Sequence, residues 1–171
     1  MTLTLDGRSM FTQPSSGILL LGLGNDFRGD DGVGRVVARR LAQTEWPGVT
    51  VREESGEGVT LMEAWKYADS VILVDAVQSG DAPGTIHRLD ARAQSIPANF
   101  FHYSTHAFSV AEAVELARAL NQLPPRLILY GIEGRDFSDG ERISPEVAAA
   151  MDELLGRVRQ EIQSILANFN H

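Results

Sequence analysis

The fold of this chain is decided by residues 18–34, which read ILLLGLGNDFRGDDGVG. The run Ile18–Leu21 is wholly apolar and is closed by a glycine, as expected of a strand buried on both faces of a parallel sheet. Apolar residues then recur at helical spacing across 33–41, which predicts a first helix starting near Asp30. A strand, a glycine-rich turn and a helix in this order open an α/β fold.

The alternation of strands and helices continues along the rest of the chain. The expected strands span 49–51, 71–74, 85–89 and 127–132, and the expected helices span 61–67, 105–120 and 144–169. This order predicts an α/β fold with a single three-layer domain of the phosphorylase or hydrolase type, in which helices cover both faces of a twisted, mostly parallel sheet. We expect this domain to span residues 17–171, after a flexible leader at 1–16.

Two of the expected helices carry further predictions. The helix at 105–120 is almost wholly apolar apart from a narrow polar stripe, which predicts that protein covers most of it. On the wet side of the last helix, Glu153 with Arg157 and Arg157 with Glu161 are spaced as i,i+4 ion pairs. Its buried stripe is expected to consist of Val147, Met151, Leu154, Leu155, Val158, Ile162, Ile165, Leu166 and Phe169.

The carboxyl ends of parallel strands carry the ligand site in this class of fold. We therefore expect the segments after Leu21, Val74 and Leu89 to share one rim with the loop 133–143. Side chains with reactive or metal-binding groups in these four segments are candidates for a single site.

Composition narrows the possible functions. With 43% hydrophobic and 22% charged residues, the 171-residue chain resembles an ordinary globular protein that can bury a full core. Its 23 acidic and 15 basic residues give a formal charge of −8, so a general phosphate-binding surface would lie in a repulsive field. Nucleic acid is therefore not an expected partner.

The sequence contains no cysteine, which excludes disulfides, cysteine-protease chemistry, thiolate zinc sites and iron–sulfur clusters. Any metal site must use His, Asp and Glu. The segment 1–17 lacks the basic and apolar regions of a signal peptide, and no later run approaches the roughly 18 apolar residues of a membrane span. We therefore expect a cytoplasmic protein that does not enter the membrane.

Two adjacent aspartates stand where the glycine-rich turn meets the first helix. A dinucleotide site is excluded because Phe27 occupies the third glycine position of that pattern and because the two acids would repel a pyrophosphate. Carboxylates in the first turn of a helix are instead stabilised by the helix dipole. Helix capping accounts for Asp30, whereas Asp31 is the better candidate for a functional role.

Asp75 and His106 are the other candidate functional residues. Asp75 ends an aliphatic strand, where an unpaired carboxylate is costly to desolvate; bonding to neighbouring backbone amides is an equally good interpretation. His106 lies at the start of the helix expected at 105–120, where the dipole favours a neutral ring, although a structural role is commoner for a single histidine. Together Asp31, Asp75 and His106 form an O,O,N set suited to a divalent ion.

Several segments match a known family in sequence and in order. They are Gly22–Gly34, the strand Val71–Ala76, Ser104-Thr105-His106, Gly131-Ile132-Glu133 and Ser144-Pro145-Glu146-Val147. In this set the chain resembles the nickel-iron hydrogenase maturation endopeptidases, over nearly all of its length after residue 16. Two rim loops depart from the family: Glu54–Gly58 replaces an Asp-Gly-Gly-Thr-like turn, and Gly134 stands where a proline is frequent. These departures bear on which large subunit is recognised.

The resemblance implies a function as well as a fold. Members of this family remove a short C-terminal extension from the hydrogenase large subunit after nickel insertion, and their metal-binding residues are thought to recognise that nickel. The resemblance places Asp31, Asp75 and His106 at the three metal-binding positions, which are also the expected catalytic residues. The expected partner is a hydrogenase large-subunit precursor, and the expected divalent metal is nickel presented by that substrate. Since packing on the sheet accounts for the apolar stripe of the last helix, we expect a monomer.

Two mechanisms are compatible with these residues. The ion could polarise the scissile carbonyl or activate a bound water. Alternatively, the ion could act only as a checkpoint that admits nickel-loaded precursor, while a nearby carboxylate assists hydrolysis. Asp30 and Glu133 are the candidates for that carboxylate.

Two other functions compete with the endopeptidase. A non-catalytic nickel-dependent binding protein, acting as a chaperone or sensor for the precursor, would use the same ligands but would never shorten its partner. A small-molecule metallohydrolase would need a closed pocket. The aromatic residues Phe100, Phe101 and Tyr103 and the polar loop 135–142 favour a protein substrate, because exposed aromatic side chains beside a site anchor partners.

Overall fold

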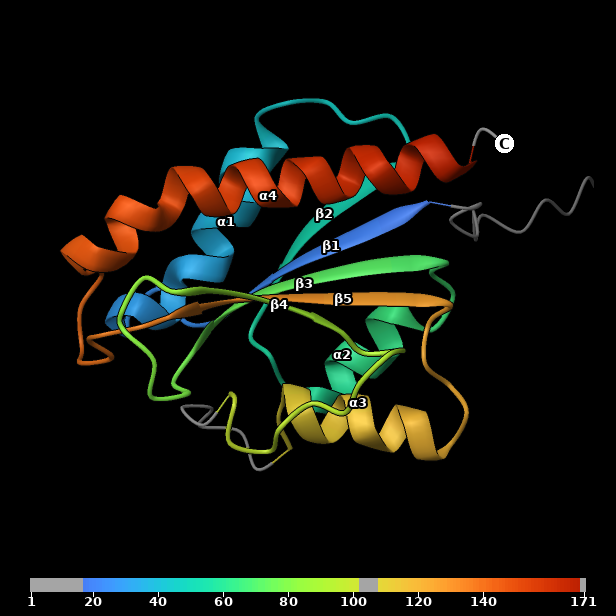
Figure 1. Cartoon of the computed structure of the whole chain (residues 1–171), viewed down its shortest axis with the longest axis horizontal. Coiled ribbons are helices and arrows are strands. Elements are labelled where there is room, and N and C mark those ends of the chain that lie inside the picture. The colour runs from blue at the N-terminus through green and yellow to red at the C-terminus, as the bar shows by residue number, and fades with distance from the viewer. Residues whose placement is uncertain (1–16, 102–107, 170–171) are drawn as a thin grey trace, which may run out of the picture.

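The computed structural model describes residues 17–101 and 108–169 (Figure 1). Its strands are β1 (Ile18–Leu23), β2 (Val49–Glu54), β3 (Ser70–Val77), β4 (Ile86–Asp90) and β5 (Arg126–Glu133). Its helices are a short 3-10 helix, η1 (Gly29–Gly32), and α1 (Val33–Ala42), α2 (Gly58–Trp65), α3 (Val110–Ala119) and α4 (Pro145–Phe169). The expected leader at 1–16 lies outside the described residues, so the division of the chain at residue 17 stays a prediction.

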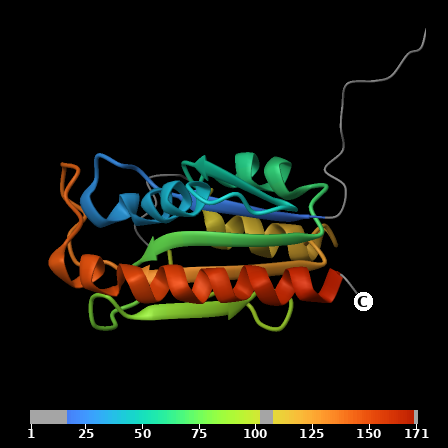
Figure 2. The ribbon, with the colours of Figure 1, turned by 90° about the horizontal axis from the view of Figure 1, so that it is seen from above.

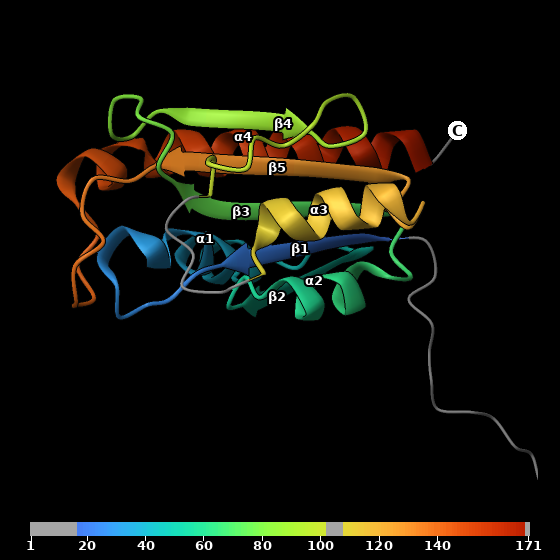
Figure 3. The ribbon, with the colours of Figure 1, turned by 90° about the horizontal axis from the view of Figure 1, so that it is seen from below.

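The five strands form one sheet in the order β2-β1-β3-β5-β4. All neighbouring strands run parallel except β4, which pairs antiparallel with β5. Helices α1 and α4 lie over one face (Figure 2), and α2 and α3 lie over the other (Figure 3). The predicted three-layer α/β fold with a mostly parallel sheet is therefore confirmed.

The central strands are buried on both faces because each face has its own hydrophobic cluster. Ile72 and Val74 of β3 pack into the cluster under α1 and α4, whereas Val71 and Leu73 pack into the cluster formed with α2 and α3. Strand β1 is buried throughout. Continuous apolar runs of this kind are what a parallel sheet between two helical layers requires.

The direction of β4 corrects one prediction about the rim. Leu89 pairs with Leu129, and the amide of Ala91 donates to the carbonyl of Leu127, so the end of β4 lies at the amino edge of the sheet. The connection 78–85 is too short for a crossover, so β4 starts at the carboxyl edge and runs back. The segment after Leu89 is thus remote from the segments that follow β1, β3 and β5.

Helix α3 begins at Val110 rather than at residue 105. Ser109 is its N-cap and forms a capping box with Glu112, which fixes the start of the helix. His106 lies outside the described residues, so the expectation that its ring is neutral stays a prediction. The helix is also less covered than predicted, since Leu116 is exposed, as is Leu120 at its C-cap.

The apolar stripe of α4 is buried as predicted, except that Leu166 is only partly buried and Phe169 is exposed. The ion pair between Glu153 and Arg157 is present. Glu161 instead binds Arg88 of β4 through two hydrogen bonds and accepts a third from the hydroxyl of Tyr130. Across residues 17–101 and 108–169, none of the helices combines the length and apolar character needed to cross a bilayer.

Candidate functional site

Asp31 and Asp75 lie together at the carboxyl edge of the sheet. Asp31 belongs to η1, which follows β1, and Asp75 lies near the end of the neighbouring strand β3. Both side chains are partly buried. One oxygen of Asp31, Oδ2, accepts a hydrogen bond of 3.0 Å from the amide of Asn25. The sequence-based expectation that these two carboxylates share a rim agrees with this arrangement.

Electrostatics shows how closely the two carboxylates are coupled. Burial raises the pKa of Asp75 well above its ordinary value, and the negative charge of Asp31 raises it further. A hydrogen bond of 2.8 Å donated by the amide of Ala76 partly offsets this. Two carboxylates that repel one another in a partly buried setting are stabilised by a cation placed between them. The pair is thus suited to hold a divalent metal ion through oxygen.

Two glycines allow the backbone to bring Asp31 close to β3. A Cβ on Gly34 would lie 2.2 Å from the carbonyl oxygen of Val74, so any larger residue would push α1 away from the strand. Gly24 has a φ of +127°, and a Cβ there would lie 1.7 Å from the carbonyl oxygen of Asp31. The glycine-rich turn therefore serves close packing of η1 and α1 on the sheet rather than phosphate binding.

The third expected ligand, His106, lies outside the described residues, as do Tyr103 and the segment between them. Within the part of the chain that the structure describes, no three histidine or acidic side chains form a group that could hold a metal ion. The structure thus brings together two of the three predicted residues, and the role of His106 stays a prediction.

Asp30 has a structural role that differs from the expected helix cap. Its side chain is fully buried and accepts hydrogen bonds of 2.8 and 2.9 Å from the amides of Arg135 and Asp136. It also accepts hydrogen bonds of 2.7 Å from the amide and 2.8 Å from the hydroxyl of Ser144. With both oxygens occupied in this way, Asp30 fastens the loop 134–144 to η1 and is not placed to assist hydrolysis.

Glu133, the other carboxylate considered for assisting hydrolysis, is also buried and fully engaged. It accepts hydrogen bonds from the amide and hydroxyl of Ser79 and from the amide of Gly80. His87 lies 3.6 Å from it and packs edge-on against Phe100. Glu133 therefore fixes the loop that follows β3.

The expected aromatic lip is largely absent from the surface. Phe100 and Phe101 are only 7% and 5% exposed and pack edge-to-face in the core, while Tyr103 lies outside the described residues. Among the described residues near the site, an exposed aromatic ring belongs instead to Phe27, which is 66% exposed. Only its position in a polar, glycine-rich turn could have indicated this, since the turn offers no apolar face to cover it.

The loops after β1 and β5 are joined into one surface, which we call the rim platform (residues 25–29 and 136–140). The amide of Gly29 donates to the carbonyl of Gly140, and the amide of Gly140 donates to that of Phe27, each at 2.8 Å. Figure 1 shows the two loops side by side at the left end of the molecule. The prediction that loop 133–143 shares the rim with the segment after Leu21 is therefore confirmed.

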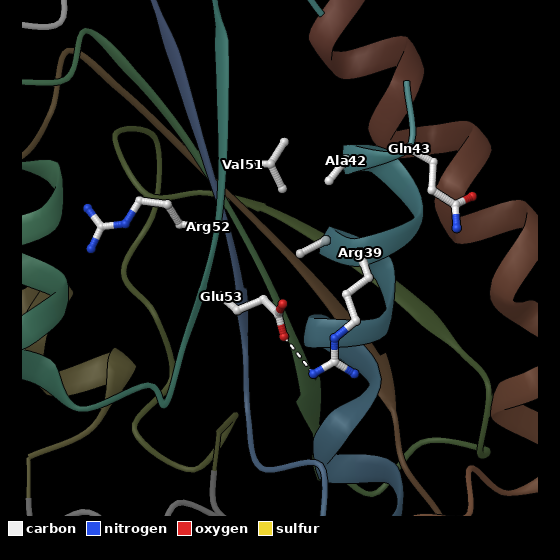
Figure 4. A pocket seen from close by; sticks show the side chains of 7 residues that line it. Arg39, Ala42, Gln43, Val51, Arg52 and Glu53 are labelled. Carbon is white, nitrogen blue, oxygen red and sulfur yellow. Dashed lines mark ion pairs between the residues drawn. The ribbon is translucent and has the colours of Figure 1, made fainter. Parts of the chain in front are cut away.

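A network of ion pairs holds the base of the rim platform against α1 and the edge strand β2. Arg39 pairs with Asp26 and lies 2.7 Å from Glu53, the contact drawn in Figure 4. Arg35 lies 3.0 Å from Glu53 and 3.5 Å from Asp26. The hydrogen bonds to Asp26 and Glu53 raise the pKa of Arg39. Sequence reasoning missed this network, which joins three separate segments.

Solved structures of other proteins share the fold of this chain. The fold is shared with the hydrogenase maturating endopeptidase HybD from Escherichia coli, with a TM-score of 0.74, 24% identity and coverage of 86% of this chain and 93% of that one. An endopeptidase from Escherichia coli matches with a TM-score of 0.72 and 26% identity, covering 83% of this chain and 89% of that one. The fold is thus that of an α/β endopeptidase.

Sequence comparison identifies the family. The sequence model described as hydrogenase maturation protease matches residues 35–161. A putative hydrogenase maturation protease of Methanocaldococcus jannaschii is 30% identical over 85% of this chain and 96% of its own length. The hydrogenase expression/formation protein HupD of Rhodobacter capsulatus is 28% identical over 86% of this chain and 71% of its own length. The chain belongs to the hydrogenase maturation protease family and is a hydrolase of peptide bonds.

Proposed function

We propose that this endopeptidase removes the C-terminal extension of a nickel-iron hydrogenase large-subunit precursor after nickel has been inserted. In this proposal Asp31, Asp75 and His106 engage the nickel that the precursor carries. The metal thus arrives with the substrate. Family membership supports the processing of a hydrogenase precursor, and the residues at the carboxyl edge support the dependence on nickel.

The observation that carries the proposal is the electrostatic coupling of Asp31 and Asp75. The negative charge of Asp31 raises the pKa of the partly buried Asp75, and this repulsion imposes a cost on the folded protein. A divalent cation bound by both would offset that cost, whereas a helix cap or a backbone contact would need only one of them. A neutral histidine nitrogen is a suitable third ligand for nickel, and in sequence His106 is the candidate.

The residues around Asp31 and Asp75 favour a direct role of the nickel ion over assistance by another carboxylate. Asp30 and Glu133 accept hydrogen bonds through both of their oxygens, so neither provides a free carboxylate for general-base assistance. A nickel ion held near the scissile bond could polarise its carbonyl or lower the pKa of a bound water to about 7. A ligand set completed only by nickel would also discriminate against a precursor that has not received its metal.

The test uses the intact mass of the precursor. A nickel-loaded and a nickel-free large-subunit precursor are each incubated with the protein, and we expect loss of a C-terminal peptide from the loaded form alone. Asp31→Ala, Asp75→Ala and His106→Ala should each abolish processing while the far-ultraviolet circular dichroism stays native. Glu63→Ala, which removes an exposed carboxylate of α2, is the matched control and should process normally.

Each alternative result has a distinct meaning. Normal cleavage by all three alanine variants would contradict the proposed role of the metal ligands. A stable complex without any loss of mass would indicate a nickel-dependent binding protein. Equal cleavage of loaded and nickel-free precursor would contradict the timing after nickel insertion.

A further inference from the structure

Phe27 combines exposure with a rigid backbone. The ring is 66% exposed, yet the amide of Phe27 donates to the side-chain oxygen of Asn25 at 2.9 Å and its carbonyl accepts from the amide of Gly140 at 2.8 Å. The next amide, that of Arg28, donates to the carbonyl of Asn25. Single exposed apolar side chains are common on proteins. An aromatic ring that is presented by a backbone fixed on both sides loses little entropy when it binds.

The same loop connects Phe27 to the carboxylates. Asn25 donates its amide hydrogen to Asp31 and accepts one from Phe27 through its side chain. One residue thus links the ring to a proposed nickel ligand, and Asp26, between Asn25 and Phe27, is held by Arg35 and Arg39. The ring therefore has a fixed position relative to the site.

The neighbouring surface leaves the ring accessible. The second loop of the rim platform contributes Ser138, Asp139 and Gly140, all of which are exposed. A Cβ on Gly140 would meet nothing within 4 Å, so the segment beside Phe27 is open to an approaching protein. A rigid exposed aromatic residue surrounded by polar groups has the form of a binding anchor.

We propose that Phe27 is a substrate-positioning residue whose ring docks on an apolar surface of the large-subunit precursor next to its nickel. This inference rests on the proposed function and extends it by naming a contact outside the metal ligands. Phe27 fixes the orientation in which the precursor presents its metal to Asp31 and Asp75. Its contribution is to substrate binding, because a phenyl ring carries no acid, base or nucleophile for the chemical step.

Cleavage kinetics with the nickel-loaded precursor test this role. Phe27→Ala should raise KM about tenfold or more while changing kcat less than twofold. Phe27→Leu, which keeps an apolar side chain, should recover most of the loss. Tyr67→Ala is the matched control, because Tyr67 is 61% exposed but lies just before β3 at the amino edge of the sheet; its KM should equal that of the wild type.

The outcomes separate this inference from the proposed function. An unchanged KM for Phe27→Ala, or an equal rise for Tyr67→Ala, would overturn the role of Phe27 while leaving the processing activity intact. A fall in kcat at constant KM would also overturn it, because that result assigns Phe27 to the chemical step. Failure of the wild-type protein to shorten the precursor would overturn the proposed function, and the docking role with it.

Discussion

Asp30 and Asp31 are adjacent in sequence, but their carboxylates have opposite surroundings. Asp30 is enclosed by donors from the loop 134–144, which satisfy its charge. Asp31 lies near enough to Asp75 for its negative charge to raise the pKa of that acid further above the effect of burial. A buried charge stabilises a fold when donors surround it and destabilises the fold when it meets its own sign. Asp30 therefore has a structural role, whereas Asp31 is the candidate functional residue.

This division predicts opposite effects of two identical substitutions. Asp30→Asn should lower the free energy of unfolding by about 2–4 kcal/mol, because an amide has a single acceptor oxygen and would turn its NH₂ group toward donors. Asp75→Asn should raise the free energy of unfolding by roughly 1 kcal/mol while abolishing processing. Urea denaturation at pH 7.5, combined with the mass assay, measures both effects.

The pH dependence of stability provides the control for Asp75. Because the folded-state pKa of Asp75 is raised, this acid does not destabilise the protein at a pH below its unfolded pKa. The protein loses stability as pH rises from there through the folded pKa of Asp75. The advantage of Asp75→Asn should therefore appear at neutral pH and vanish near pH 4. An advantage that stays constant over this range would show that the gain does not come from the carboxylate charge.

Sequence reasoning identified the carboxylate pair because strand ends can be located from apolar runs. The short runs that end near Leu21 and at Val74 are neighbouring strands, so the acids that follow them meet at one edge. It misassigned Asp30, because the partners that define its role are far away in sequence: Arg135 is 105 residues and Ser144 is 114 residues from it. The burial of Phe100 and the exposure of Phe27 likewise depend on tertiary packing.

Among the secondary-structure elements, the strands of the parallel core could be predicted from the sequence, whereas the direction of β4 and the start of α3 could not. Each predicted strand is present, since a sheet covered on both faces requires continuous apolar runs. The direction of β4 could not be read from its residues, because the alternation of side chains is the same in both directions. The start of α3 was also missed: apolar residues precede Ser109, and they concealed its capping box with Glu112.

The contact between α4 and the sheet provides a prediction at this scale. Glu161 accepts hydrogen bonds from Arg88 at 2.7 and 3.0 Å and from the hydroxyl of Tyr130 at 2.8 Å. The hydrogen bonds from Arg88 are the main reason why the pKa of Glu161 is lowered. Burial of Tyr130, together with its hydrogen bond to Glu161, raises the pKa of Tyr130 to about 12. Glu161→Gln should lower the free energy of unfolding by about 1–2 kcal/mol at pH 7.

The sign of the pH effect follows from the lowered pKa of Glu161. Its contribution is present above the ordinary pKa of 4.5 and is lost as pH falls through the folded pKa, so the stabilities of wild type and Glu161→Gln should converge as pH falls below 4.5 and through that lowered pKa. Glu153→Gln is the control, because Glu153 forms an exposed i,i+4 pair with Arg157. Its effect should stay within about 0.5 kcal/mol at every pH. Equal effects of the two substitutions would contradict the anchoring role of Glu161.

In the molecule as a whole, the charged and polar groups of the candidate site gather at the carboxyl edge of the sheet. The carboxyl edge holds the opposed carboxylates, the buried Asp30 and Glu133, and the rim platform. Hydrogen bonds of Asp30 and Glu133 to the surrounding loops make that edge rigid before a substrate arrives. A rigid edge that holds two electrostatically coupled acids is suited to a cation that a partner delivers, because binding then requires little reorganisation.

This arrangement predicts how the protein responds to chelation. If the nickel belongs to the precursor, then treating the enzyme alone with excess EDTA, followed by removal of the chelator, should leave the rate of cleavage of nickel-loaded precursor within twofold of the untreated rate. Stripping nickel from the precursor should abolish cleavage, and reloading it should restore cleavage. A resident catalytic metal would give the reverse pattern, with the treated enzyme inactive until metal is added back. The carboxylate pair favours the first result, because Asp31 raises the pKa of Asp75 and a cation supplied by the precursor would offset that repulsion.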